Sequence, residues 1–172
     1  MLDILLKRKS VRTYTGEGLT DEELNLILKA CNASPVGMKR YDTLHLTIVS
    51  DQELLAKIIE ESSKMFNRGS PLYGAPILIL ISSSALHPGM ENVMYSNAAI
   101  MSHNIALAAT ELNIGSCYIW GATAAISKND EILKELKLPE GHILCCGVIL
   151  GKTLEKYEVK EIPERISITF IK

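Results

Sequence analysis

The segment from 91 to 121, ENVMYSNAAIMSHNIALAATELNIGSCYIWG, constrains the fold more than any other part of the chain. Between Val93 and Leu112 its apolar residues do not keep to one stripe but surround the predicted helix. These residues are Ala98, Ala99, Ile100, Met101, Ile105, Ala106, Leu107, Ala108 and Ala109. A helix that is apolar on nearly every side is normally buried. We therefore expect this helix to lie inside the protein.

Polar residues also interrupt this helix and decide what surrounds it. They are Ser96, Asn97, Ser102, His103 and Asn104. The uninterrupted apolar runs between them are too short for a membrane span, so the surroundings are expected to be protein.

The end of this helix leads into a short strand. Asn113 and Gly115 are typical helix terminators, and the stretch 116–120 predicts a strand that ends at Gly121. Because glycine lets other groups approach the backbone closely, the end of this strand can hold backbone amides against a flat ligand.

Length and composition predict one globular domain over residues 1–172. The 19.0 kDa chain is long enough for a sizeable core and too short for two domains of ordinary size. Its apolar fraction is 47% and its aromatic fraction only 5%, so the core must be mostly aliphatic. A net charge of -2 provides no overall basic field, which argues against a nucleic-acid partner.

The N-terminal sequence and the cysteines indicate a cytoplasmic protein. The opening MLDILLKRKS has no apolar region followed by a small-residue cleavage site, so we expect no secretion signal. Cys31, Cys117, Cys145 and Cys146 form no C-x-x-C pair, and in a reducing compartment they are expected to stay free thiols.

A basic loop follows a short predicted helix over residues 2–8. In RKSVRTYTG, the cations Arg8, Lys9 and Arg12 surround Ser10. Guanidinium groups donate paired hydrogen bonds and the hydroxyl adds one more, so this set can bind a phosphate. A solvated basic turn is the alternative interpretation.

Two further helices are predicted by capping-box spacing. Thr20 and Glu23 start a helix over 20–31, and Ser50 and Glu53 start the next one. Apolar residues at helical spacing follow each start.

Three strands and one more helix complete the predicted body. Strands are expected over 44–49, over the continuous apolar run ILILIS at 77–82 and over ILCCGVILG at 143–151. The run at 77–82 is typical of a central strand buried on both faces. The stretch 129–138, NDEILKELKL, predicts a short amphipathic helix. Cys145 and Cys146 should point to opposite faces of their strand as small core residues.

The C-terminal region is expected to leave the body of the chain. Residues 152–165 are polar and charged, and ISITFI at 166–171 alternates as a last strand. A strand joined by so long a polar arm need not pair within its own chain.

Several common site signatures are missing from the sequence. It contains no GxGxxG or Walker loop and no nucleophile-elbow signature. The four histidines, His45, His87, His103 and His142, lack metal-ligand spacing, so no metal site is expected.

The order of these motifs over essentially the whole chain resembles the FMN-dependent nitroreductase family. The motifs are RKSVRTYTG, SPVG, YGAPILILI, NAAIMSHNIALAATELNIGSCYIWG and GVILGK. The resemblance implies an α+β fold with a mixed central sheet flanked by helices. It also implies an intertwined homodimer that exchanges C-terminal strands and holds FMN at the subunit interface.

The resemblance further implies a set of FMN-binding residues. They are Arg8, Lys9, Ser10, Arg12, Pro35, Val36, Gly37, Lys39, Trp120, Gly121 and, in the tail, Lys160 or Arg165. The basic loop would bind the phosphate and ribityl chain, Lys9 through its backbone, and a tail cation would complete the phosphate site. The backbone N–H at positions 120–121 would reach the ring nitrogen that takes the hydride. The flavin carries the chemistry, so no catalytic side chain is expected.

The chain departs from the family pattern after the SP turn. Many members continue with Asn-x-Gln-Pro-Trp, whose Asn reaches the flavin ring, whereas this chain reads VGMKRYD. Lys39 or Arg40 stands roughly at the place of that Asn. A cation there could stabilise negative charge on the reduced flavin, or it could point into water.

The resemblance implies an oxidoreductase that passes electrons from NAD(P)H through FMN to a nitroaromatic, quinone or similar small acceptor. A flavin-binding redox sensor or flavin carrier without significant turnover is the alternative. The cavity for the acceptor is expected to be bordered by residues 63–74 and 36–42, and neither stretch has a pattern that identifies the acceptor.

Overall fold

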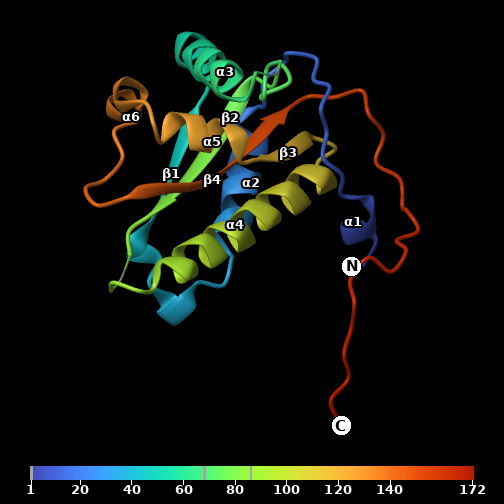
Figure 1. The fold of residues 1–172 in the computed structure, drawn as a ribbon. Helices are drawn as coiled ribbons and strands as arrows, with labels where there is room; N and C mark the ends of the chain where they lie inside the picture. Colours follow the sequence, from blue (N-terminus) through green and yellow to red (C-terminus); the bar gives the residue numbers. More distant parts are fainter. Residues whose placement is uncertain (1, 68, 86) are drawn as a thin grey trace.

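The computed structural model describes residues 2–67, 69–85 and 87–172, and these contain a four-stranded sheet (Figure 1). Its strands, in spatial order, are β1 (Leu44–Val49), β2 (Ile77–Ser83), β4 (Ile143–Gly151) and β3 (Gly115–Ile119). All three pairings between neighbouring strands are antiparallel. The strands predicted at 44–49, 77–82 and 143–151 are confirmed, and β3 lies one residue before its predicted range.

Helices cover both faces of this sheet. They are α1 (Leu2–Lys7), α2 (Asp21–Asn32), α3 (Gln52–Phe66), α4 (Glu91–Glu111), α5 (Gly121–Ile126) and α6 (Asp130–Leu136), with short 3-10 turns at Gly37–Lys39 and Tyr41–Thr43. The helices α2 and α4 pack on one face, and α3, α5 and α6 lie on the other (Figure 1). The expected α+β architecture is therefore confirmed, but the sheet, which was expected to be mixed, is antiparallel throughout the described residues.

The central strand β2 is buried at every position, as its continuous apolar sequence predicts. Ile77, Ile79 and Ile81 pack toward α2 and α4, while Leu78 and Leu80 pack toward the other helical layer. Because both faces are covered, polar and apolar residues do not alternate along this strand.

The prediction that Cys145 and Cys146 point to opposite faces of the sheet is wrong. Both thiols are buried in the same core cluster, on the side of α2 and α4. The pairing register shifts here, because Ile81 pairs with Cys146 whereas the next residue, Ser82, pairs with Leu144. Cys145 is therefore the extra residue of a β-bulge, and a bulge breaks the alternation of side chains. Burial raises the pKa of Cys145 to about 11 and that of Cys146 to about 12, so both stay protonated thiols near neutral pH.

The two predicted capping boxes have different outcomes. At α2 the box is complete: the Thr20 hydroxyl accepts from the Glu23 N–H at 3.2 Å, and the Thr20 N–H donates to the Glu23 carboxylate at 2.9 Å. At α3 the prediction of Ser50 is wrong, because Asp51 is the N-cap and its carboxylate accepts from the Leu54 N–H at 2.8 Å. An aspartate caps as well as a serine, and its charge also interacts favourably with the helix dipole.

The long helix α4 is buried on one side only in the single chain. Its buried residues are Met94, Asn97, Ala98, Met101, Ser102, Ile105, Ala109 and Thr110. On its outer side Tyr95 is 49% exposed and Ile100 is 39% exposed. The expectation that this helix is buried nearly all round is therefore not met by this chain alone. We call the exposed side that carries Tyr95 and Ile100 the apolar stripe of α4.

The chain after β4 first follows the body and then leaves it. The Thr153 hydroxyl donates to the Thr13 carbonyl at 2.8 Å, and the Tyr157 hydroxyl donates to the Ile114 carbonyl at 2.7 Å. We call residues 158–172 the C-terminal arm; it extends away from the rest of the chain (Figure 1). Among the described residues none after Gly151 belongs to a strand, so the predicted strand at 166–171 is not paired here. Phe170 is 81% exposed and Ile171 is 94% exposed.

Within the described parts of the chain, none of the helices has the length and apolar character needed to cross a membrane.

Candidate functional site

A single buried residue fixes the basic loop on the sheet. Val11 is fully buried, its N–H donates to the Ser116 carbonyl of β3 at 2.9 Å, and its carbonyl accepts from the Tyr14 hydroxyl at 2.9 Å. The neighbours of a residue anchored in this way point away from the core. Ser10 is therefore half-buried at the end of β3, and Arg12 is exposed.

Arg12 reaches a cavity with a volume of about 800 Å³, which we call the main cavity. It is lined by Arg12, Ser62, Phe66, Gly69, Ser70, Pro71, Tyr73, Cys117, Tyr118, Ile119, Trp120 and Gly121. These residues come from the basic loop, the end of α3, the turn that follows it, β3 and the start of α5. The volume is within the range of small-molecule sites.

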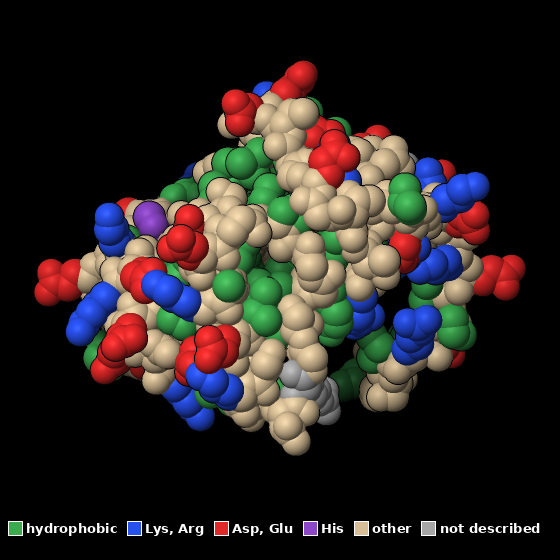
Figure 2. All heavy atoms as spheres, turned by 90° about the horizontal axis from the view of Figure 1, so that it is seen from above, with side chains coloured by type: hydrophobic (Ala, Val, Ile, Leu, Met, Phe, Trp, Pro, Cys, Tyr) green, Lys and Arg blue, Asp and Glu red, His purple; other side chains and the backbone are tan. Residues whose placement is uncertain are grey.

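The junction of β3 and α5 forms one wall of the main cavity. The Trp120 side chain is 61% exposed, and its ring lies 6.4 Å from that of Phe66, centroid to centroid, at an interplanar angle of 55°. A Cβ atom at Gly121 would lie 3.4 Å from the Phe66 ring, an ordinary van der Waals distance, so this ring packs beside the Gly121 backbone. The face of the molecule seen in Figure 2 accordingly carries hydrophobic side chains in its middle and charged side chains around them.

Cys117 lies on the floor of this cavity, close to the basic loop. Burial raises the pKa of its thiol, and a hydrogen bond from Ser10 together with the charges of Arg12 and Arg8 partly opposes that shift. Both guanidinium groups therefore lie near the same point of β3. The thiol itself stays protonated near neutral pH, so it is not an activated nucleophile.

Arg8, however, lines a different cavity from Arg12. This second cavity has a volume of about 310 Å³ and lies between the basic loop, β3 and the outer side of α4. Its lining residues are Arg8, Ala99, Ser102, His103, Ala106, Ser116 and Tyr118. Tyr118 borders both cavities, so the two arginines lie on either side of this residue.

The Lys9 ammonium is engaged by the segment that follows β4. It forms an ion pair with Glu155 at 2.7 Å and lies 5.7 Å from the centre of the Tyr157 ring. Its side chain therefore holds the chain end against the basic loop. The contact between its backbone and FMN that the resemblance implies stays a prediction.

The predicted residues of the SP turn pack on a different side of α4 from the Arg8 cavity. The Gly37 N–H donates to the Asn97 side-chain oxygen at 3.0 Å, and a Cβ atom at Gly37 would lie 3.1 Å from Val93. The Ser34 hydroxyl accepts from the Asn104 side chain at 2.8 Å, so the turn packs along the Asn97 and Asn104 side of the helix. The Arg8 cavity borders Ala99, Ser102, His103 and Ala106, which face the opposite side of α4 at 3.6 residues per turn. The structure therefore does not bring Pro35, Val36, Gly37 and Lys39 together with the basic loop of the same chain.

Of the two cations after this turn, Arg40 is already paired. Its guanidinium forms two hydrogen bonds with the Asp42 carboxylate, at 2.8 and 2.7 Å. Lys39 is exposed and has a left-handed backbone with a φ of 55°, next to Met38 at 54°. This rare conformation projects both side chains away from the body of the chain. Lys39 is therefore the better candidate for contact with a ligand.

The tail cations Lys160 and Arg165 lie on the C-terminal arm, where both side chains are exposed. Neither residue lines the main cavity of its own chain. The choice between them stays open.

Several residues that line the main cavity were not predicted as site residues, notably Ser62, Phe66, Tyr73 and Cys117. The stretch 63–74, expected to border an acceptor cavity, does contribute to the lining, although residue 68 lies outside the described residues. The sequence signal for a cavity in this stretch was the lack of periodicity beside aromatic residues. Such a signal does not show which side chains face the cavity.

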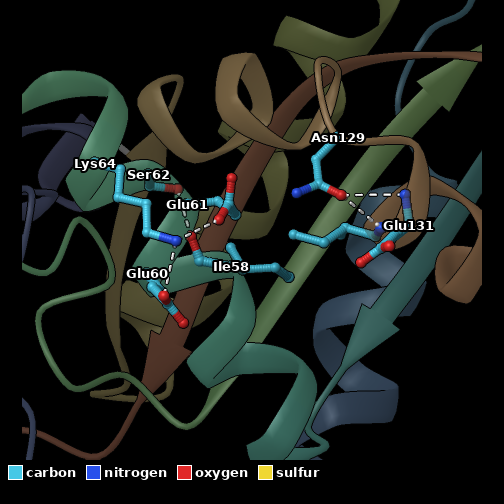
Figure 3. Close-up of polar contacts among 8 residues, drawn as sticks. Ile58, Glu60, Glu61, Ser62, Lys64, Asn129 and Glu131 are labelled. Atoms are coloured by element: carbon cyan, nitrogen blue, oxygen red, sulfur yellow. Dashed lines mark hydrogen bonds and ion pairs between the residues drawn. The ribbon is translucent and has the colours of Figure 1, made fainter.

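The charge at the end of α3 is already neutralised. Lys64 points toward Glu60 and Glu61, with nitrogen–oxygen distances of 2.8 and 3.0 Å, while Asn129 caps α6 nearby (Figure 3). Lys64 is therefore not a substitute for the cations of the basic loop. In the described parts of the chain, no group of three or more His, Cys, Asp or Glu side chains is arranged to hold a metal ion.

Comparison with known proteins places this arrangement in a family. The model of the nitroreductase family matches residues 5–71 and 60–152, which is most of the chain. The chain belongs to the nitroreductase family. The match includes the basic loop, the SP turn and the β3–α5 wall, and it ends at residue 152, directly after β4.

Individual members of the nitroreductase family are similar over nearly the full length of the chain. A relative from Archaeoglobus fulgidus, whose name includes "NADH dehydrogenase/NAD(P)H nitroreductase", is 27% identical over 171 residues, which cover 96% of this chain and 92% of the relative. A nitroreductase with bound FMN from Desulfitobacterium hafniense is 26% identical with a TM-score of 0.84, covering 99% of this chain and 97% of that one. A nitroreductase with bound FMN from Bacteroides fragilis is 28% identical with a TM-score of 0.81, covering 99% and 98%.

Proposed function

We propose that residues 1–172 form one FMN-binding domain and that the protein is an FMN-dependent oxidoreductase. It would take electrons from NAD(P)H and pass them to a nitroaromatic, a quinone or a similar small acceptor. The observation that carries this proposal is the main cavity, in which a guanidinium group lies beside an aromatic wall and the glycine backbone of β3 and α5. Family membership, the FMN bound to two similar structures and the NAD(P)H in a relative's name support it.

The shape and chemistry of the main cavity fit FMN. A flat ring needs an apolar wall with polar backbone groups at its edge, and the Trp120–Gly121 junction provides both. A phosphate needs a cation with paired donors, which Arg12 provides. Bound FMN would supply hydride and electron transfer, so the chain itself needs no catalytic side chain.

The residues of the chain would bind and orient the cofactor. Arg12 and Ser10 would hold the phosphate end, and the Gly121 N–H would donate a hydrogen bond to the ring edge. Phe66 and Trp120 would exclude water from one side of the ring while leaving the cavity mouth open to an acceptor.

We also propose that the working form is a homodimer in which each site is shared by two chains. Three observations support this: α4 has an exposed apolar stripe, the C-terminal arm exposes many apolar side chains, and the turn at 35–39 packs on the side of α4 opposite to its own Arg8 cavity. A second copy would cover the stripe and the arm, and would bring Lys39 and one of Lys160 and Arg165 to the cavity of its partner. The proposal includes a cytoplasmic location, which the four free buried thiols support.

A flavin-binding sensor or carrier without turnover is the second candidate. It is favoured by the departure after the SP turn, where Arg40 is already paired with Asp42 and only Lys39 remains to contact the ring.

Spectroscopy of the purified protein tests both candidates. We expect a yellow protein with flavin absorbance, or an apoprotein that gains this absorbance when it binds added FMN. Under anaerobic conditions NADH or NADPH should bleach the bound flavin within seconds in a stopped-flow experiment. An added quinone or nitroaromatic should then restore the colour. Binding of FMN without reduction by either nicotinamide would favour the sensor, and a protein that fails to bind FMN would contradict both.

A further inference from the structure

Tyr73 has a backbone conformation that bulky residues rarely adopt. Its φ is 51°, in the left-handed region, and Gly74 follows with a φ of 81°. Glycine takes this conformation freely, and asparagine takes it more easily than other residues, but an aromatic side chain there is an outlier. Residues held in such conformations are concentrated at ligand sites, so this one calls for a functional explanation.

The turn around Tyr73 is fixed by its neighbours. Leu72 is fully buried, and its carbonyl accepts from the Ala75 N–H at 2.9 Å, directly before β2. The Leu72 N–H is in turn held by the Ser70 hydroxyl at 3.3 Å. With both sides anchored, the backbone at position 73 is left-handed whichever residue occupies it, and the tyrosine accepts the strain.

The strained backbone brings the Tyr73 ring to Arg12. The guanidinium carbon of Arg12 lies 5.8 Å from the centre of this ring, and both side chains line the main cavity. A hydrogen bond with the Tyr73 side chain also raises the pKa of Arg12. The Tyr73 side chain is otherwise 41% exposed, so packing in the core does not explain its presence.

An aromatic partner suits a cation that must bind an anion. Among the described residues no carboxylate forms an ion pair with Arg12, whereas Lys9, Arg40, Lys57, Lys64 and Lys152 each have one. A carboxylate would compete with an incoming phosphate for the guanidinium donors. An aromatic ring restricts the long, flexible arginine side chain without adding a competing negative charge.

We propose that Tyr73 is a positioning residue for Arg12: it is kept in a strained left-handed conformation so that its ring directs the guanidinium group toward the phosphate of the cofactor. This inference rests on the proposed function, because it takes FMN as the ligand. It adds a residue outside the predicted cofactor-binding set, and it predicts that replacement of Tyr73 weakens FMN binding without lowering stability.

The test is Tyr73→Asn, with thermal unfolding of the apoprotein and titration of FMN and riboflavin as readouts. Asparagine tolerates the left-handed backbone, so the midpoint of unfolding should rise or stay unchanged. The affinity for FMN should fall about two- to fivefold, the effect of losing an exposed cation–π contact. Riboflavin, which has no phosphate, should bind as it does to the parent. Tyr73→Phe keeps the ring and should restore most of the affinity for FMN.

Lys137→Asn is the matched control for the backbone effect. Lys137 also has a left-handed backbone, with a φ of 50°, but it ends α6, is exposed and does not line the main cavity. Its replacement should raise the unfolding midpoint without changing the affinity for FMN.

A double variant shows whether Tyr73 acts through Arg12. In an Arg12→Ala background, Tyr73→Asn should cause no further loss of FMN affinity, because the group that Tyr73 positions is already missing. Full additivity of the two losses in FMN affinity would overturn the inference. Equal losses for FMN and riboflavin, or a lowered unfolding midpoint in Tyr73→Asn, would also overturn it, because either result would indicate a structural role. If the parent protein binds FMN and only these outcomes fail, the proposed function stands without the inference; if the parent binds neither flavin, both are overturned.

Discussion

At the scale of single residues, Val11 decides where the cations of the basic loop lie. Its full burial and its hydrogen bond to Ser116 fix the loop on the edge of β3. Arg12 then enters the main cavity, while Arg8 is directed to the cavity beside α4. Two arginines four residues apart in the sequence therefore have different surroundings, and their contributions to binding should differ.

The first prediction concerns Arg12→Ala. If Arg12 binds the FMN phosphate, its loss removes a charge-assisted hydrogen bond worth roughly 1.5 to 3 kcal/mol, or about ten- to a hundredfold in affinity. Arg12→Lys should rescue only part of this, because lysine keeps the charge and loses the forked geometry. Titration of FMN into the apoprotein of each variant measures both effects.

Arg8→Ala and riboflavin are the controls for this prediction. Arg8 lines the second cavity, so its replacement should weaken FMN binding less than Arg12→Ala does. Riboflavin binding should barely change in Arg12→Ala. An FMN affinity within about twofold of the parent would instead identify Arg12 as an exposed, solvated cation, since such charges contribute little.

How far the sequence predicts individual residues depends on whether their role is chemical or geometric. The phosphate-binding potential of the basic loop follows from its side chains alone, so Arg12 could be predicted. The side of β3 that each arginine occupies depends on the burial of Val11, and Tyr73 reaches Arg12 only through a left-handed backbone. Neither the burial of Val11 nor the left-handed backbone of Tyr73 can be predicted from a sequence pattern.

At the scale of elements, the start of α2 is connected to the end of the sheet. The Glu23 carboxylate accepts from the Thr20 N–H in the capping box and also pairs with the Lys152 ammonium, directly after β4. The hydrogen bond from Lys152, followed by that from Thr20, lowers the pKa of Glu23. This one carboxylate therefore stabilises both the helix start and the point where the chain leaves the sheet.

The second prediction follows from that lowered pKa and concerns Glu23→Gln. A carboxylate whose pKa is lower in the folded than in the unfolded protein contributes stability above its ordinary pKa of 4.5, and this contribution is lost as the pH falls through the folded value. Glu23→Gln should therefore unfold at a lower denaturant concentration than the parent at pH 7, and the difference should shrink below about pH 4. Denaturant titrations at several pH values measure it.

Glu22→Gln is the control, because Glu22 lies in the same helical turn and is exposed. It removes one charge without removing the pairing to Lys152. A difference between parent and Glu23→Gln that is the same at pH 7 and pH 3 would contradict the assigned ion pair.

Among the elements, those with strong periodicity were predictable and the irregular ones were not. The run at 77–82 and the capped helix after Thr20 follow from their patterns. The six-residue helix α5 was not predicted, since a helix this short shows no full period. The bulge at Cys145 was missed because it depends on pairing with β2, which a single strand does not reveal.

At the scale of the whole molecule, the single chain leaves much apolar surface uncovered. The outer stripe of α4 and the C-terminal arm both remain exposed, although the sequence predicts burial for the one and a strand for the other. Burial and pairing that one chain does not supply are what a second copy would provide. The sequence thus predicts a partner, and the structure shows which apolar surfaces of the single chain are exposed.

The third prediction is that removal of residues 158–172 prevents dimer formation. The segment up to Tyr157 is hydrogen-bonded to the body and stays in place, so this truncation removes only the exposed arm. We expect a monomeric or insoluble protein that does not retain FMN, measured by light scattering and flavin absorbance. A soluble dimer with bound FMN would show that the arm neither crosses the interface nor supplies a phosphate cation.

The central claim, a flavin site shared by two chains, can be tested with mixed dimers of two defective chains. One chain carries Arg8→Ala and Arg12→Ala in the basic loop, and the other carries Lys39→Glu in the turn on the opposite side of α4. In a dimer with one chain of each kind, the first site joins an intact basic loop to an intact turn, and the second site has both defects.

The measurement is the titration of FMN into the apoprotein of such mixed dimers, purified through two different tags. If each site takes its basic loop from one chain and its turn from the other, mixed dimers bind one FMN per two chains with the affinity of the parent, whereas both defective homodimers bind weakly. Mixed dimers that bind FMN no more tightly than the defective homodimers would contradict the shared site, and so would parental affinity for FMN in a protein that stays monomeric.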